Sequence, residues 1–232
     1  MSAQASTDNR RARGEATKNA LMRAAEKLIA DDGVENVSIR EIVAAADQKN
    51  ESALQYHFKN LTGLLEAIHI ERAATVEHKR AELLAATLER TQTPSLRELC
   101  SLMIEPTFQL ARSNPEFRRY IKAFGHQLAL SDTSPLTGLH NKERGRALAP
   151  LLKAALPHLT KDDYRARMEA AIRLSSASMH HQAKQRNAFR GEQSDLFLNN
   201  LLDALSGLLN APVSAETRAV KSAAAKLRKT KK

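Results

Sequence analysis

The chain has 232 residues, of which 36 are Lys or Arg and 26 are Asp or Glu, and its formal net charge is +10. Glycine and proline are scarce and good helix formers abound, so the composition predicts helices nearly throughout, and no sustained alternation of apolar and polar residues predicts a strand. No apolar run is long enough to cross a membrane or to act as a signal peptide, and a single cysteine excludes an internal disulfide. We therefore expect an all-α, cytoplasmic protein.

The first segment, residues 1–14, is polar and basic, and we expect it to be disordered until it binds a partner. Its arginines, Arg10, Arg11 and Arg13, either enter a minor groove of DNA or remain a solvated, nonspecific arm. Residues 1–60 as a whole hold nine basic and nine acidic residues. Any nucleic-acid binding by this part of the chain must therefore depend on where its charges are placed.

Two helices are predicted next along the chain. Apolar residues recur at helical spacing from about Glu15 to Asp32, and Gly33 is placed to end that helix in a left-handed conformation. Ser38 and Glu41 have the spacing of a reciprocal capping box, which marks the start of a second, shorter helix.

The stretch from residue 38 to 58, SIREIVAAADQKNESALQYHF, predicts a pair of short helices joined by a tight turn. Asn50 is a candidate N-cap for the later one, in which Leu54 and Phe58 lie one turn apart on one face. Two short helices of which the second offers polar side chains are typical of a helix-turn-helix unit that reads DNA.

Candidate DNA contacts follow from this arrangement. Helix N-termini attract phosphates, and a glutamine such as Gln55 can pair with adenine through two hydrogen bonds, while an alanine methyl can meet a thymine methyl. Tyr56 and His57 have an alternative to a DNA contact, since both side chains could instead pack against the first helix. The predicted DNA-binding residues are Ser38, Arg40, Lys49, Asn50, Ser52, Ala53, Gln55, Tyr56, His57 and Lys59.

Asn60 or Thr62 can cap a fourth helix that runs to about Arg90 and has the length of a rod connecting two domains. A polar break at residues 91–95 follows. Pro106 falls within the next helix, where a proline can introduce a kink. Further helices are predicted near residues 96–112, 115–130, 136–156, 162–190 and 194–210.

The second half of the chain contains candidate residues for a ligand pocket and for a subunit interface. The last of these helices is apolar on more than one side, which fits a helix that faces both the domain core and a partner subunit, or one that is buried entirely. His180 and His181 are adjacent and point about 100° apart on a helix, so no metal site is predicted, and no cofactor is expected. Six aromatic, sulfur-bearing or polar side chains are either pocket or core residues: Met103, Phe108, Phe117, Tyr120, Phe124 and His126.

The final segment, residues 211–232, is basic and we expect it to be disordered. Residues 212–232 hold seven basic residues and one acidic residue. This tail either adds salt-dependent affinity for DNA or only keeps the chain soluble. No glycine-rich phosphate loop, HExxH, paired CxxC or GxSxG motif occurs, so no catalytic residue and no enzymatic activity are predicted.

The run from Thr17 to Ile68 resembles the N-terminal domain of TetR/AcrR-type transcriptional regulators. Asp47 takes the turn position that usually holds glycine, and Leu61 stands where a phosphate-binding lysine is often found. The matching residues are Thr17, Leu21, Ala24, Ala25, Leu28, Gly33, Val37, Ser38, Ile39, Ile42, Ala46, Tyr56, His57, Phe58, Leu64 and Leu65.

The resemblance implies a helix-turn-helix domain at residues 15–75 and an effector-binding and dimerisation domain at residues 76–210. It implies a homodimer that pairs through its C-terminal helices, binds a near-palindromic operator and releases it when a small-molecule effector binds. Two other functions stay open from the residues alone: a nucleoid-type protein that binds DNA without sequence preference through its tail, and a helical enzyme.

Overall fold

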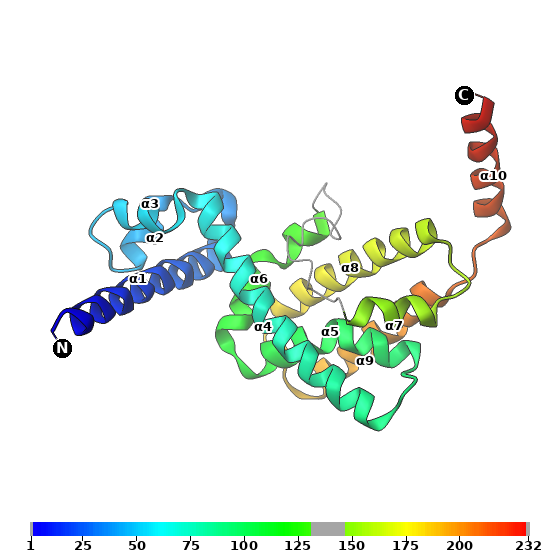
Figure 1. Ribbon diagram of the computed structural model, residues 1–232, viewed down its shortest axis with the longest axis horizontal. Coiled ribbons are helices and arrows are strands. Elements are labelled where there is room, and N and C mark those ends of the chain that lie inside the picture. Colours follow the sequence, from blue (N-terminus) through cyan, green and yellow to red (C-terminus); the bar gives the residue numbers. More distant parts are fainter. Residues whose placement is uncertain (1, 131–146, 231–232) are drawn as a thin grey trace.

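The computed structural model describes residues 2–130 and 147–230. These residues form ten α-helices and one short 3-10 helix, with no strand among them (Figure 1). The all-α fold predicted from the sequence is confirmed. No helix of the described ranges has the length and apolar character needed to cross a membrane.

The N-terminal domain is built from α1 (Ser2–Asp32), η1 (Val34–Asn36), α2 (Ile39–Ala45), α3 (Ser52–Phe58) and the first turns of α4 (Leu61–Arg90). Its core contains the apolar stripe of α1 together with side chains from the other helices. Side chains that are fully out of contact with water include Leu21, Ala25, Ile42, Leu54, Leu64 and Ile68. Ala123 and Phe124 from α6 complete this core, so the N-terminal domain shares its interior with the rest of the molecule.

The start of α1 differs from the prediction. The helix begins at Ser2 and not near Glu15, so the basic segment that we expected to be disordered is helical. At its other end the prediction is confirmed in part, because Gly33 has a φ of 87°. Its ψ of 154° lies outside the left-handed helical region, in a conformation that is essentially restricted to glycine.

The C-terminal domain consists of α5 (Leu96–Ser113), α6 (Pro115–Leu130), α7 (Leu148–Ala155), α8 (Lys161–Ala183) and α9 (Gly191–Asn210). Helix α6 packs along α8, and α5 packs against α4, α6, α7 and α9. Their core is a second cluster that contains Phe108, Phe117, Phe189 and Leu205. Pro106 lies buried within α5, which continues through it.

Two of the predicted C-terminal helices have different bounds. The helix expected at residues 136–156 is seen only as α7, and residues 136–146 lie outside the described ranges. The helix expected at 162–190 ends at Ala183, because the chain turns at residues 184–190, where Phe189 has a φ of 62°. The other predicted helices agree with α5, α6 and α9 to within three residues.

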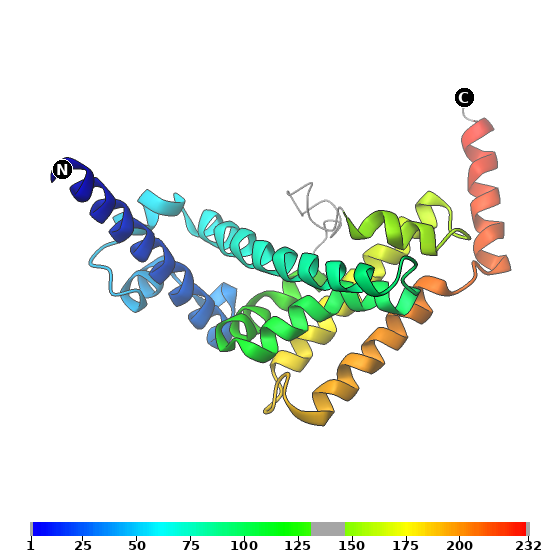
Figure 2. The same ribbon diagram turned by 60° about the horizontal axis from the view of Figure 1, so that its bottom comes forward.

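The tail also differs from the prediction. Residues Ala215–Thr230 form a helix, α10, where we expected disorder. An Ala-rich segment has a high helix propensity, which accounts for the difference. An ion pair between Lys221 and Asp163 joins α10 to the start of α8. Helix α10 projects from the end of the molecule opposite α1, α2 and α3 (Figure 1, Figure 2).

Candidate DNA interface

Helix α2 starts at a complete capping box. The backbone N–H of Glu41 donates to Ser38 Oγ at 3.3 Å, and Glu41 Oε2 accepts from the backbone N–H of Ser38 at 2.8 Å. The Ser38 hydroxyl also donates to Glu41 Oε2 at 2.7 Å, which lowers the pKa of that carboxyl. Ser38 is thus engaged as a cap, while the neighbouring Arg40 is exposed and available for a phosphate.

The turn between α2 and α3 depends on Asp47. Its φ of 54° confirms the left-handed geometry predicted for this position, which aspartate tolerates better than most residues. The backbone N–H of Asp47 donates to the carbonyl of Ala44, and the Gln48 side chain donates to the carbonyl of Ala46 at 3.0 Å. These bonds close the turn and fix where the second helix begins.

Helix α3 has one buried face and one exposed face. Leu54 and Phe58 lie in the core of the domain, as their spacing predicted. Ser52 and Gln55 are exposed on the other face, whereas Ala53 packs partly against the core, so its methyl is only partly available to a base. A helix that is anchored on one side and polar on the other is suited to enter a major groove.

Polar and basic residues lie at both ends of the exposed α3 face. The N-cap position of α3 is held by Glu51 and not by the predicted Asn50, which lies one residue earlier. Asn50 Oδ1 nevertheless accepts from the backbone N–H of Ser52 at 3.1 Å and from the Ser52 hydroxyl. Lys49 and Lys59 are exposed at the two ends of the helix. Lys59 has a φ of 69°, which turns the chain sharply toward α4.

The two aromatic residues at the end of α3 have separate environments. Tyr56 is 84% exposed, so the alternative in which it packs against the first helix is wrong. His57 is half-buried and lies against α1, since a Cβ added at Gly14 would meet His57 Cε1 at 3.9 Å. The two rings meet edge to face with their centroids 4.9 Å apart. His57 thus helps to hold Tyr56 in its outward position.

The start of α4 fixes the orientation of α3. Asn60 Oδ1 accepts from the backbone N–H of Gly63 at 2.9 Å, which confirms Asn60 as the predicted cap. Leu61, which stands where TetR/AcrR-type regulators often have a lysine, packs against the core of the domain. The exposed Lys59 is the nearest basic side chain in the sequence, two residues before Leu61.

Residues 21–68 match the family model described as bacterial regulatory proteins, tetR family. This chain carries a TetR-family DNA-binding domain. The match runs from α1 through α2 and α3 into α4, and so includes the exposed α3 face and the residues at both ends of it. A comparison with curated proteins finds no match. The chain is therefore a DNA-binding transcriptional regulator with a TetR-type N-terminal domain.

The six side chains predicted as pocket or core residues lie in the interior of the C-terminal domain and at its junction with the N-terminal one. Phe108, Phe117 and Phe124 are buried, and Tyr120 contacts both core clusters. The Nδ1 atom of His126 is buried and has no hydrogen-bond partner among the described residues, and the centroid of its ring lies 5.1 Å from that of His180. None of the six lines the cavity between α1, α6 and the loop after α8, or the one between α4 and α5, so their role in effector binding stays a prediction.

Sequence reasoning missed a buried ion pair between Glu26 on α1 and Arg72 on α4. The guanidinium group donates two hydrogen bonds of 2.7 Å to the carboxylate, and both side chains are buried. A single acidic residue within the apolar stripe of α1 was the available signal, since an unpaired carboxylate does not belong there. The pair fixes α1 to the helix that enters the C-terminal domain.

Proposed function

We propose that this chain is a homodimeric repressor that acts in the cytoplasm and releases its operator when a small-molecule effector binds. The observation that carries the proposal is the exposed face of α3, in which Gln55 and Tyr56 stand between Lys49 and Lys59. These side chains can reach base edges and phosphates together. Helix α4 continues without a break from this unit into the C-terminal domain, which offers a direct mechanical connection between effector and DNA.

Dimerisation is supported by apolar side chains left exposed on the neighbouring helices α8 and α9. Leu174 on α8 is 37% exposed and Leu196 on α9 is 55% exposed. A Cβ added at Gly207 would meet no atom within 4 Å, so this part of α9 is open for another helix to approach. Two copies joined along these helices would present two α3 faces to successive major grooves of a near-palindromic site.

A titration of DNA fragments from the region upstream of the chain's own gene tests operator recognition. We expect tight binding to one fragment at about 0.15 M salt and much weaker binding to a scrambled sequence of equal length. The variant Gln55→Ala should lose about 1–3 kcal/mol of that preference, since a bidentate pair with a base is worth this much. The matched control is Gln193→Ala, because Gln193 is an exposed glutamine on α9.

The alternative is a nucleoid-type protein that binds DNA through its basic tail without sequence preference. Helix α10 lies at the end of the molecule opposite α3, so a tail that bound DNA would do so apart from the exposed α3 face (Figure 1). Deletion of residues 212–232 separates the two functions. A repressor keeps its operator preference after the deletion, whereas a tail-dependent binder loses most of its affinity for every sequence.

A further inference from the structure

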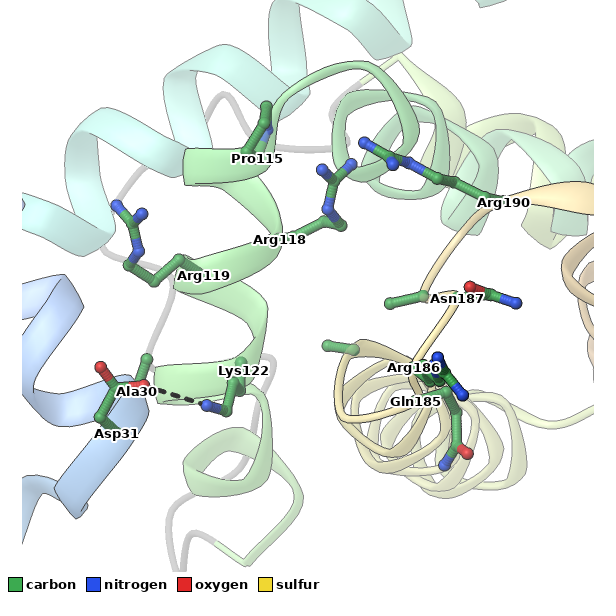
Figure 3. Close-up of a pocket in the computed structure, with 12 residues that line it drawn as sticks. Ala30, Asp31, Pro115, Arg118, Arg119, Lys122, Gln185, Arg186, Asn187 and Arg190 are labelled. Atoms are coloured by element: carbon green, nitrogen blue, oxygen red, sulfur yellow. Dashed lines mark hydrogen bonds and ion pairs between the residues drawn. The ribbon is translucent and has the colours of Figure 1, made fainter.

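A cavity of about 340 Å³ lies where the N-terminal and C-terminal domains meet. Its walls come from the end of α1, the first half of α6 and the loop at residues 184–190 that joins α8 to α9 (Figure 3). The volume is within the range of sites that bind small molecules.

The lining of this cavity is strongly basic. Five of its side chains are cationic, and Asp31 is the one acidic residue among those that line it. Lys122 Nζ lies 3.2 Å from Asp31 Oδ1, so this pair is balanced and four guanidinium groups remain. The cationic residues are Arg118, Arg119, Lys122, Arg186 and Arg190.

The four arginines are not equally engaged. Arg118 Nη1 donates to the carbonyl of Ala111 at 2.6 Å, and the pKa of its guanidinium is lowered by burial and by the positive charge of Arg190. Arg186 and Arg190 are exposed, and within the described residues their side chains have no hydrogen bond or ion pair. Like charges that are held together without counter-charges repel each other, and a bound anion would relieve this repulsion.

The loop that carries Arg186 and Arg190 is held in place by its own anchor. Phe189 is fully buried at a φ of 62°, and its ring meets that of Phe108 edge to face at 5.4 Å. Arg112 Nε donates to the carbonyl of Phe189 at 2.9 Å. A non-glycine residue at positive φ persists only when its surroundings hold it there, so the backbone that carries the two arginines is held in place. Figure 3 shows Arg118 and Lys122 on one side of the gap and Arg186 and Asn187 on the other.

We propose that this cavity binds a small molecule with two or more negative charges on phosphate or carboxylate groups. The planar guanidinium group matches both oxyanions, and Arg118, Arg186 and Arg190 lie around the same gap, whereas Arg119 points to the other side of α6 (Figure 3). DNA is a less suitable occupant, because the cavity lies at the end of α1 that is remote from the basic N-terminal turns of that helix.

The cavity is placed to act on the DNA-binding domain, a consequence that rests on the proposed function. Ala30 and Asp31 belong to the last turn of α1, whereas the arginines belong to α6 and to the loop between α8 and α9. Glu26, which pairs with Arg72, lies one turn earlier on α1. An anion that bridges the two sides favours one position of α1 relative to α6, and a ligand shifts a conformational equilibrium by its difference in affinity for the two states.

The test is a calorimetric titration of the full chain, without DNA, with inorganic pyrophosphate and separately with citrate at about 0.15 M salt. We expect saturable binding of at least one probe, and the stronger one identifies the oxyanion that the site prefers. The double variant Arg186→Gln/Arg190→Gln should weaken binding by about tenfold or more, since hydrogen bonds to charged groups are the strong ones.

The matched control is Lys153→Gln/Lys161→Gln, which also removes two exposed positive charges but lies outside the cavity. Thermal melts establish that both double variants are folded. The proposal is overturned if neither probe binds saturably, or if the control weakens binding as much as the arginine variant does.

The result of the calorimetric titration is independent of the result for operator binding. A chain that prefers its operator but binds neither probe keeps the proposed function and loses this site. A chain with no operator preference whose pyrophosphate or citrate binding still depends on Arg186 and Arg190 keeps the site and loses the proposed function.

Discussion

Arg72 donates two parallel hydrogen bonds of 2.7 Å to the carboxylate of Glu26, 46 residues earlier in the chain. Arg23 adds a third hydrogen bond of 2.8 Å to the same carboxylate from the preceding turn of α1. The Arg72 guanidinium also lies over the Phe117 ring of α6, 5.8 Å from its centroid. One buried carboxylate and its partners therefore connect α1, α4 and α6, the three helices through which the two domains meet.

Removal of one partner of this pair should be costly. At a pH where Glu26 is ionised, we expect Arg72→Leu to lower the free energy of unfolding by about 3–5 kcal/mol, because it removes two of the three guanidinium hydrogen bonds to a buried carboxylate. Urea denaturation followed by circular dichroism measures the change. The double variant Glu26→Met/Arg72→Leu should recover most of the loss, since an apolar pair of similar volume often replaces a buried ion pair without penalty. Equal losses in the single and double variants would contradict this account.

The stability of the chain should depend on pH through Glu26, and the same variant should show this dependence more strongly. Burial raises the pKa of Glu26 from 4.5 to about 8, and the positive charge of Arg23 opposes that shift. Where the native pKa exceeds the unfolded one, the native state binds more protons, so stability falls as pH rises between the two values. Without Arg72 to favour the ionised form, Arg72→Leu should be less stable at about pH 8 than at about pH 5.

Chemical denaturation at both pH values measures this difference. The variant Glu26→Gln/Arg72→Leu is the control, because it has no titratable group at position 26 and should not show the fall. Equal stability of Arg72→Leu at the two pH values would mean that Glu26 does not titrate in this range.

The parts of the fold that were predictable from the sequence are local ones. The capping box of Ser38 and Glu41, the Asn60 cap and the tolerance of Asp47 for a left-handed turn each depend on residues a few positions apart. The inward face of α3 was equally visible, because Leu54 and Phe58 are separated by one helical turn.

The remaining features depend on contacts between distant segments. Glu26 and Arg72 become partners only when α1 crosses α4, and Arg190 comes near Arg118 only when the loop after α8 is held by Phe189. The prediction that the segments at the two ends are disordered was wrong for another reason. Both segments are rich in charged residues and in good helix formers. Such a composition is as consistent with a disordered segment as with the helices α1 and α10.

Gly63 sets how closely α3 approaches α4. A Cβ at this position would lie 2.1 Å from the carbonyl oxygen of Phe58, a backbone atom that cannot move away without shifting the end of α3. We expect Gly63→Ala to destabilise the chain by about 1–3 kcal/mol and to weaken operator binding in the fraction that remains folded. Thermal melts and DNA titrations measure the two effects.

Gly14→Ala is the matched control, since the added methyl group would make only an ordinary contact of 3.9 Å with His57. It should raise stability by about 1 kcal/mol through helix propensity. An unchanged melting temperature and operator affinity in Gly63→Ala would show that α3 and α4 adjust to each other more freely than their contact indicates.

Lys49 and Gln55 should contribute to DNA binding in measurably different ways. Lys49 is exposed just before α3, where a phosphate contact releases counterions but carries no sequence information. We expect Lys49→Ala to weaken binding to operator and scrambled DNA alike, and to reduce the slope of log affinity against log salt by about 1. Gln55→Ala should leave that slope unchanged and lower only the preference for the operator.

Lys153→Ala, at an exposed position on α7, controls for the loss of one charge, since it should leave the slope near its original value. A loss of sequence preference in Lys49→Ala would instead place this lysine on a base edge and reverse the two assigned roles.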